Sequence, residues 1–148
     1  MSRFAKQFVL AAIATIATMP TLLATSAQAQ VIRCQCTQYV ANHFNLSRNF
    51  PNAGDWDNGY LQRNNFVRVA TAQPGTIAVM ERTFSGADRT FGHVGIVESN
   101  RNGFTSLRGA NQPVGGNLFA QSGCNNVRIT NFGTNVNGNP HISFWKRG

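Results

Sequence analysis

The sequence has few acidic residues. Five Asp and Glu stand against 13 Lys and Arg, so the formal net charge is +8. It also lacks a dense basic run, because its arginines are scattered along the chain, and it has no recognisable nucleic-acid-binding motif, internal repeat or second module. Nucleic-acid-binding domains usually concentrate Lys and Arg on one face or in a known motif. We therefore expect no nucleic-acid partner.

Cysteine is also scarce, with Cys34, Cys36 and Cys124 as the full set. Three cysteines cannot all pair within one chain, so at least one remains a thiol even in an oxidising compartment. No C-x-x-C motif is present, and the other imidazoles, His43 and His141, fit structural positions. The Cys34-x-Cys36 spacing leaves a metal or redox site as an alternative. We expect neither a metal nor a cofactor.

Long apolar runs are confined to the N-terminus. Arg3 and Lys6 precede a mostly apolar stretch over residues 8–23, and Ala27-Gln28-Ala29 forms a small-x-small cleavage motif. This order predicts a cleavable secretion signal over residues 1–29. The alternative is a retained membrane anchor, but the apolar run is shorter than the ~20 residues that a membrane-spanning helix needs. We expect a secreted, periplasmic or wall-associated protein.

Residues 30–148 remain after cleavage, which is enough chain for one hydrophobic core. We expect a single domain and a monomer. Cleavage of the leader would remove two basic residues. The remaining chain would then have 11 basic and 5 acidic residues, a net charge of +6. An exported basic protein is attracted to anionic surfaces such as cell-wall polymers.

The pattern of apolar residues predicts little helix. Tyr39, Val40, His43 and Phe44 recur at helical spacing and indicate a helix over residues 36–46. A second helix is predicted over 55–63, with Asp55 as its N-cap. Five strands are predicted over 76–81, 93–99, 104–108, 127–132 and 142–145, while 109–126 reads as a loop. This order is typical of an α+β fold, with a helix packed on an antiparallel sheet of about five strands.

The first residue of the first predicted helix, Cys36, is a candidate nucleophile. The partial positive charge of a helix N-terminus favours the thiolate over the thiol. His93 lies at the mouth of an apolar strand-like run and can supply a base. A cysteine followed much later by a histidine suits a thiol–imidazole pair that meets only in the folded chain.

Four blocks of sequence around these residues occur in an order that resembles the CHAP (cysteine-, histidine-dependent amidohydrolase/peptidase) family. They are Cys36-Thr37-Gln38-Tyr39-Val40-Ala41-Asn42, Asn52-Ala53-Gly54-Asp55-Trp56, Pro74-Gly75-Thr76-Ile77-Ala78-Val79 and Gly92-His93-Val94-Gly95-Ile96-Val97-Glu98. The resemblance implies a papain-like fold in which Cys36 is the nucleophile and His93 the general base. It also implies peptidoglycan as substrate, cut at an amide bond.

The sequence departs from the family at the residue that orients the histidine. Many members carry an acidic residue followed two positions later by Asn, and here that run reads Arg108-Gly109-Ala110-Asn111. A hairpin at Asn102-Gly103 would return the chain to His93 at Asn111 or Gln112. We predict Asn111 as the third member of the site. Glu98 is excluded because it points to the opposite face of its strand from His93.

If Cys36 is the catalytic thiol, Cys34 and Cys124 are left to form a disulfide. Three functions remain open at this stage. The first is a peptidoglycan hydrolase, either an N-acetylmuramoyl-L-alanine amidase or an endopeptidase. The second is a cysteine peptidase acting on protein. The third is a non-catalytic wall-binding protein, which the missing acid at Gly109 keeps open.

Overall fold

The computed structural model describes residues 34–114, 118–119, 128–132 and 136–148. The predicted leader and Cys124 lie outside these ranges. The helical elements are α1 (Cys36–Phe44), η1 (Ala53–Asp55), η2 (Trp56–Tyr60) and α2 (Leu61–Arg63). The strands are β1 (Phe66–Val69), β2 (Ile77–Met80), β3 (His93–Arg101), β4 (Phe104–Gly109), β5 (Pro113–Val114), β6 (Leu118–Phe119), β7 (Arg128–Asn131) and β8 (Ile142–Arg147).

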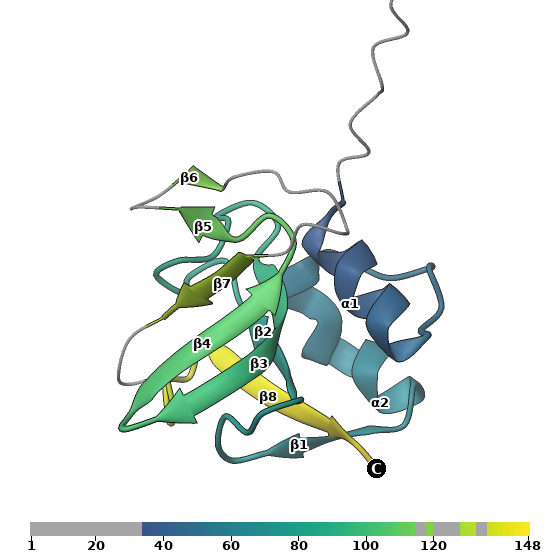
Figure 1. Cartoon of the computed structure of the whole chain (residues 1–148). Coiled ribbons are helices and arrows are strands. Elements are labelled where there is room, and N and C mark those ends of the chain that lie inside the picture. Colours follow the sequence, from purple (N-terminus) through teal and green to yellow (C-terminus); the bar gives the residue numbers. More distant parts are fainter. Residues whose placement is uncertain (1–33, 115–117, 120–127, 133–135) are drawn as a thin grey trace, which may run out of the picture.

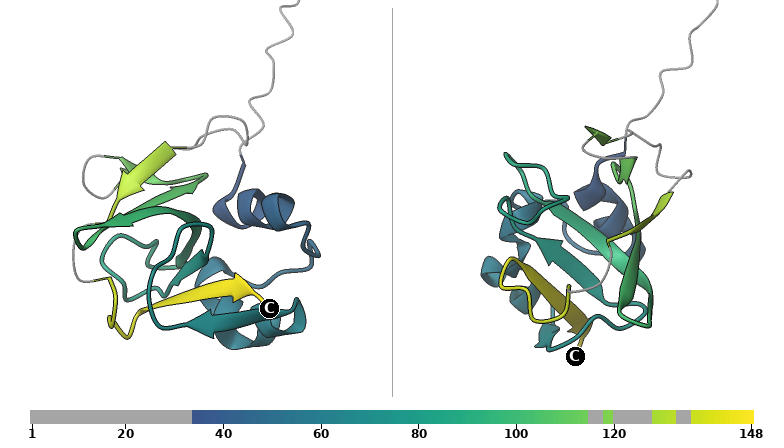
Figure 2. Two further views of the ribbon diagram at one scale, coloured as in Figure 1. Left: turned by 60° about the horizontal axis from the view of Figure 1, so that its bottom comes forward. Right: turned by 90° about the vertical axis from the view of Figure 1, so that its left-hand side faces the viewer.

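Six strands of the described chain form one antiparallel sheet in the order β1-β8-β2-β3-β4-β7, and β5 pairs separately with β6. The helices α1 and α2 lie together on one side of this sheet (Figures 1 and 2). The predicted α+β class is therefore confirmed. Each of the five predicted strands is present, and the sixth, β1, was not predicted. It is short and forms an edge of the sheet against β8.

The alternating side chains of the central strands build a core on each face of the sheet. On the face that α1 covers, the core includes Val40, Trp56, Leu61, Ile77, Val79, Val94, Ile96 and Trp145. The opposite core includes Ala78, Met80, Phe84, Val97, Leu107, Ile142 and Phe144. Because β2 and β3 contribute to both cores, they are buried on both faces, and the start of β3 is held rigidly between two packed layers.

The first predicted helix is confirmed and ends two residues early, at Phe44, because Asn45 adopts a left-handed conformation with φ of 52°. The second, predicted over 55–63, is broken into short pieces. Asn58 and Gly59 leave helical geometry, with φ of 94° at Gly59. Asp55 does not cap a helix as predicted, because its carboxylate instead pairs with Arg82.

None of the helices described is both long enough and apolar enough to cross a membrane.

Candidate active site

Cys36 is the first residue of α1, and its side chain is only 9% exposed. The helix start is fixed by a reciprocal capping box. The Gln35 side chain accepts the Gln38 backbone N–H, and Gln38 Oε1 accepts the Gln35 N–H at 3.0 Å. Among the described cysteines, Cys36 is the free thiol. The backbone N–H of Val94 hydrogen-bonds to its sulfur. The thiol therefore lies beside the residue that directly follows His93.

Burial raises the pKa of the Cys36 thiol above its usual value. The backbone N–H groups of Val94, Thr37 and Cys36 itself act in the opposite direction, and the negative charge of Asp88 adds to the rise. We expected the helix N-terminus to favour the thiolate. In the folded protein, loss of solvation outweighs that effect. The resting thiol is therefore neutral, and a base must remove its proton before it can attack.

His93 begins β3 immediately after a tight turn formed by residues 88–92. The Gly92 N–H donates to the Asp88 carbonyl at 2.8 Å, and the Asp88 carboxylate accepts the N–H groups of Thr90 and Phe91, each at 2.8 Å. Gly92 has a φ of 71°, and a Cβ built on it would lie 2.5 Å from Gly54 Cα. Only glycine fits there, so η1 can pack directly against the residue that precedes His93.

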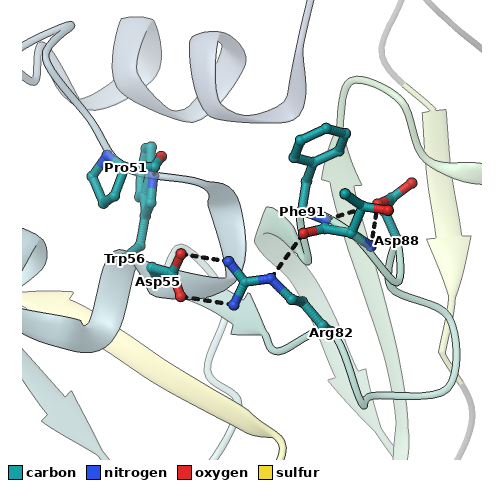
Figure 3. Close-up of polar contacts among 7 residues, drawn as sticks. Pro51, Asp55, Trp56, Arg82, Asp88 and Phe91 are labelled. Atoms are coloured by element: carbon teal, nitrogen blue, oxygen red, sulfur yellow. Dashed lines mark hydrogen bonds and ion pairs between the residues drawn. The ribbon is translucent and has the colours of Figure 1, made fainter.

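An ion pair braces the same turn from a second side, as Figure 3 shows. Arg82 binds both carboxylate oxygens of Asp55, at 2.9 and 2.6 Å, and its Nε donates to the Thr90 carbonyl at 2.8 Å. The Gly54 N–H donates to the Phe91 carbonyl at 2.9 Å. The turn that carries His93 is thus tied to η1 through both backbone and side chain.

The His93 imidazole is almost fully buried and contacts Gln112, with 2.7 Å between His93 Nε2 and Gln112 Oε1. A carbonyl oxygen only accepts hydrogen bonds, so Nε2 carries the proton and Nδ1 carries the lone pair. Burial lowers the pKa of His93 to about 4, although Gln112 and Asp88 both act to raise it. The imidazole is therefore neutral at physiological pH and can act as a base through Nδ1.

The structure corrects the predicted third residue of the site. Asn111 does not accept the imidazole N–H. Its Nδ2 donates to Gln35 Oε1 at 2.7 Å, and its Oδ1 has no hydrogen-bond partner among the described residues. Gln112, one residue further on, takes the place against His93. The reason lies in the backbone, because Asn111 adopts a left-handed conformation with φ of 53°, which ends the strand alternation that the prediction assumed.

Gly109 provides the space that Gln112 occupies. A Cβ built on Gly109 would lie 3.1 Å from Gln112 Nε2 and 3.6 Å from the Cα of Gly95. Gln112 is fully buried, and its side chain passes close to Gly109 and contacts His93. The acidic side chain of the family is thus missing at Gly109, and the amide of Gln112, three residues further along the chain, contacts His93. Gly109 was the sequence signal for this exchange, but only the folded backbone identifies Gln112.

The remaining residues singled out in the sequence have structural positions. Glu98, which was excluded as a partner of the histidine, pairs with Arg108 at 3.0 Å. Trp56 is fully buried in the core on the α1 face and donates to the Pro51 carbonyl, so it lines no surface groove. Cys34 is fully buried. Because Cys124 lies outside the described residues, the Cys34–Cys124 disulfide remains a prediction.

The family model of the CHAP domain matches residues 26–112, which is more than half of the chain and includes both Cys36 and His93. The chain belongs to the CHAP domain family. The family predicted from the four sequence blocks is therefore confirmed.

Among solved structures, this CHAP domain is similar to an N-acetylmuramoyl-L-alanine amidase from Staphylococcus aureus. The two share 21% identity with a TM-score of 0.58, over 77% of this chain and 31% of the amidase chain. The chain therefore corresponds to less than a third of that protein, and the similarity establishes the fold. Comparison with curated protein sequences gave no match.

Proposed function

We propose that the protein is an exported cysteine hydrolase that cuts an amide bond of peptidoglycan, with Cys36 as nucleophile and His93 as general base. The observation that carries the proposal is that a free, buried thiol at the start of α1 lies beside the residue that directly follows the buried imidazole of His93. The Cys36 sulfur lies against the backbone of Val94, and the proton of His93 is held on Nε2 by Gln112. The family membership and the fold of an N-acetylmuramoyl-L-alanine amidase support peptidoglycan as the substrate.

The reaction follows from the protonation states. His93 Nδ1 accepts the thiol proton as the sulfur attacks the substrate carbonyl, and the new C–S bond forms a tetrahedral oxyanion. Backbone N–H groups at the start of α1 are oriented to stabilise that negative charge. The imidazolium then protonates the leaving nitrogen and the C–N bond breaks, leaving a thioester on Cys36. Water, activated by the neutral imidazole, hydrolyses this thioester and restores the thiol.

Gln112 also bears on the alternative of a non-catalytic wall-binding protein. A decayed site has no need to keep the tautomer of a buried histidine fixed. Here the acid that the family carries is missing at Gly109, but a buried amide occupies its space and contacts His93 Nε2. This arrangement favours a working enzyme.

Export and attraction to the wall complete the proposal. Residues 1–29 have the order of a cleavable leader, and the chain that remains is basic. We propose that it acts as a monomer at the anionic wall, outside the cytoplasm.

Digestion of purified peptidoglycan, followed by mass spectrometry of the released muropeptides, tests this function. An amidase releases stem peptides with a free alanine N-terminus, whereas an endopeptidase releases glycan-linked fragments cut within the peptide. Protein treated with iodoacetamide is the control, because alkylation of the Cys36 thiol should stop either reaction. Turnover of protein substrates without any release from peptidoglycan would replace the proposal with a protein-directed peptidase.

A further inference from the structure

Two neighbouring residues, Asn111 and Gln112, contact the two halves of the site. Asn111 Nδ2 donates to Gln35 Oε1 at 2.7 Å, and Gln35 directly precedes Cys36. Gln112 Oε1 accepts the proton of His93 Nε2, also at 2.7 Å. One short segment after β4 therefore holds the chain beside the nucleophile with one side chain and the base with the next.

The backbone of this segment is suited to that task. Asn111 has a φ of 53°, a left-handed conformation that Asn tolerates better than most residues do. Gly109 leaves the space through which Gln112 reaches His93. The left-handed conformation of Asn111 costs free energy. It occurs where the side chains of Asn111 and Gln112 turn toward different partners, Gln35 and His93.

The contact with Gln35 extends into the first turn of α1. Gln35 Oε1 accepts Asn111 Nδ2, and the Gln35 side chain also accepts the backbone N–H of Gln38 in the capping box. The Gln35 backbone N–H in turn donates to Gln38 Oε1. Asn111 is thereby connected through one side chain to both ends of the turn that contains Cys36.

We propose that Asn111 and Gln112 form a two-residue clamp that sets the position of Cys36 relative to His93, with Asn111 acting on the nucleophile through Gln35. The inference rests on the proposed function and makes Asn111 a positioning residue rather than a catalytic one. Misplacing reacting groups by about 1 Å can cost on the order of a hundredfold in rate. A contact far from the substrate can therefore affect turnover more than it affects folding.

The clamp can be separated from ordinary structural support because its contact with Gln35 lies near the surface. Gln35 is exposed and Asn111 half-buried, so shortening either side chain opens no cavity in the core. Asn111→Gly keeps the left-handed backbone accessible while it removes the donor. Asn102→Gly is a matched control, since Asn102 has a φ of 51° in the β3–β4 hairpin, away from the site.

The test compares wild type, Asn111→Gly, Gln35→Ala, their double variant and Asn102→Gly in two assays. The first assay is turnover of peptidoglycan fragments, and the second is the rate at which iodoacetamide alkylates Cys36. We expect each site variant to lower kcat at least tenfold with KM changed less than threefold, and to slow alkylation. The double variant should be no worse than the poorer single variant, and Asn102→Gly should match wild type.

Wild-type kcat and alkylation in Asn111→Gly would overturn the clamp, and so would independent effects that multiply in the double variant. The alkylation assay needs no substrate. If the wild type released nothing from peptidoglycan, the proposed function would fail, while the alkylation rates would still decide whether Asn111 positions Cys36.

Discussion

At the scale of single residues, the site depends on which nitrogen of His93 carries the proton. Gln112 Oε1 can only accept, so the proton is on Nε2 and the basic lone pair is on Nδ1. Burial lowers the pKa of the imidazole to about 4 and raises that of the Cys36 thiol. Both shifts favour a neutral pair before substrate binds. We therefore propose that the reaction starts from a neutral thiol and a neutral base rather than from a preformed ion pair.

Gln112→Glu should move the acidic limb of the pH–activity profile to higher pH. The base acts only when neutral, so wild-type kcat/KM should fall as pH drops through the His93 pKa of about 4. A carboxylate against Nε2 would stabilise the imidazolium and raise that pKa. The substitution breaks no hydrogen bond of Gln112 Nε2, which has no partner among the described residues. We expect the limb to move up by at least one pH unit.

Measuring kcat/KM between pH 3.5 and 8 checks this shift. Glu98→Gln is the control, because that carboxylate pairs with Arg108 on the surface and its loss should leave the limb in place. Identical acidic limbs in wild type and Gln112→Glu would remove Gln112 from the description of the base.

Cys36 and His93 could be selected as candidates from the sequence because both stand out by local pattern, one at a helix start and the other as the first residue of an apolar strand. Sequence reasoning narrowed the third residue to a hairpin return at Asn111 or Gln112 and then chose the wrong one. Periodicity carries no information on the left-handed conformation at Asn111, which decides the side chain that turns inward. Gly109 showed that the acidic side chain of the family is missing, but it could not indicate that Gln112 contacts His93.

At the scale of elements, the turn of residues 88–92 and the short helix η1 place His93. Their backbones meet at Gly54 and Gly92, and a Cβ on Gly92 would lie only 2.5 Å from Gly54 Cα. The Asp55–Arg82 ion pair is partly exposed and contributes little stability by itself. The close backbone contact therefore does most to fix this interface.

Gly92→Ala should destabilise the fold by about 2–4 kcal/mol, because it adds overpacking to a left-handed backbone that alanine disfavours. For a domain of this size, the melting temperature should fall by roughly 10 °C or more. Gly138→Ala is the matched control, since Gly138 has a φ of 78° and no atom of the described residues lies within 4 Å of its added Cβ. Thermal unfolding followed by circular dichroism measures both. Equal losses in the two variants would mean that the contact with Gly54 contributes nothing.

The elements themselves were predictable to different degrees. The α1 helix and the five predicted strands follow from strong periodicity and were found. The predicted 55–63 helix contained its own breaker, since Asn58-Gly59 is a turn dipeptide and the chain leaves helical geometry there. The edge strand β1 has only four residues, and its pairing with β8 is a long-range contact that no local pattern encodes.

At the scale of the whole molecule, we predict a single exported domain with Cys34 joined to Cys124. This disulfide would close a loop of about ninety residues and, on loop entropy alone, stabilise the fold by roughly 4–5 kcal/mol. Peptide mapping without reductant, on protein recovered from an oxidising compartment, decides the pairing. A Cys34–Cys36 bridge or three free thiols in such protein would refute it, and a bridge that includes Cys36 would also remove the nucleophile.

The central claim is that the Cys36 thiol attacks the substrate. The most direct measurement compares wild type with Cys36→Ala for the release of muropeptides from purified peptidoglycan, with circular dichroism of both proteins as the check on folding. We expect no turnover by Cys36→Ala and a melting temperature close to that of wild type, because alanine at a helix start removes the sulfur without burying a charge. Release of wall fragments by Cys36→Ala at the wild-type rate would contradict this claim.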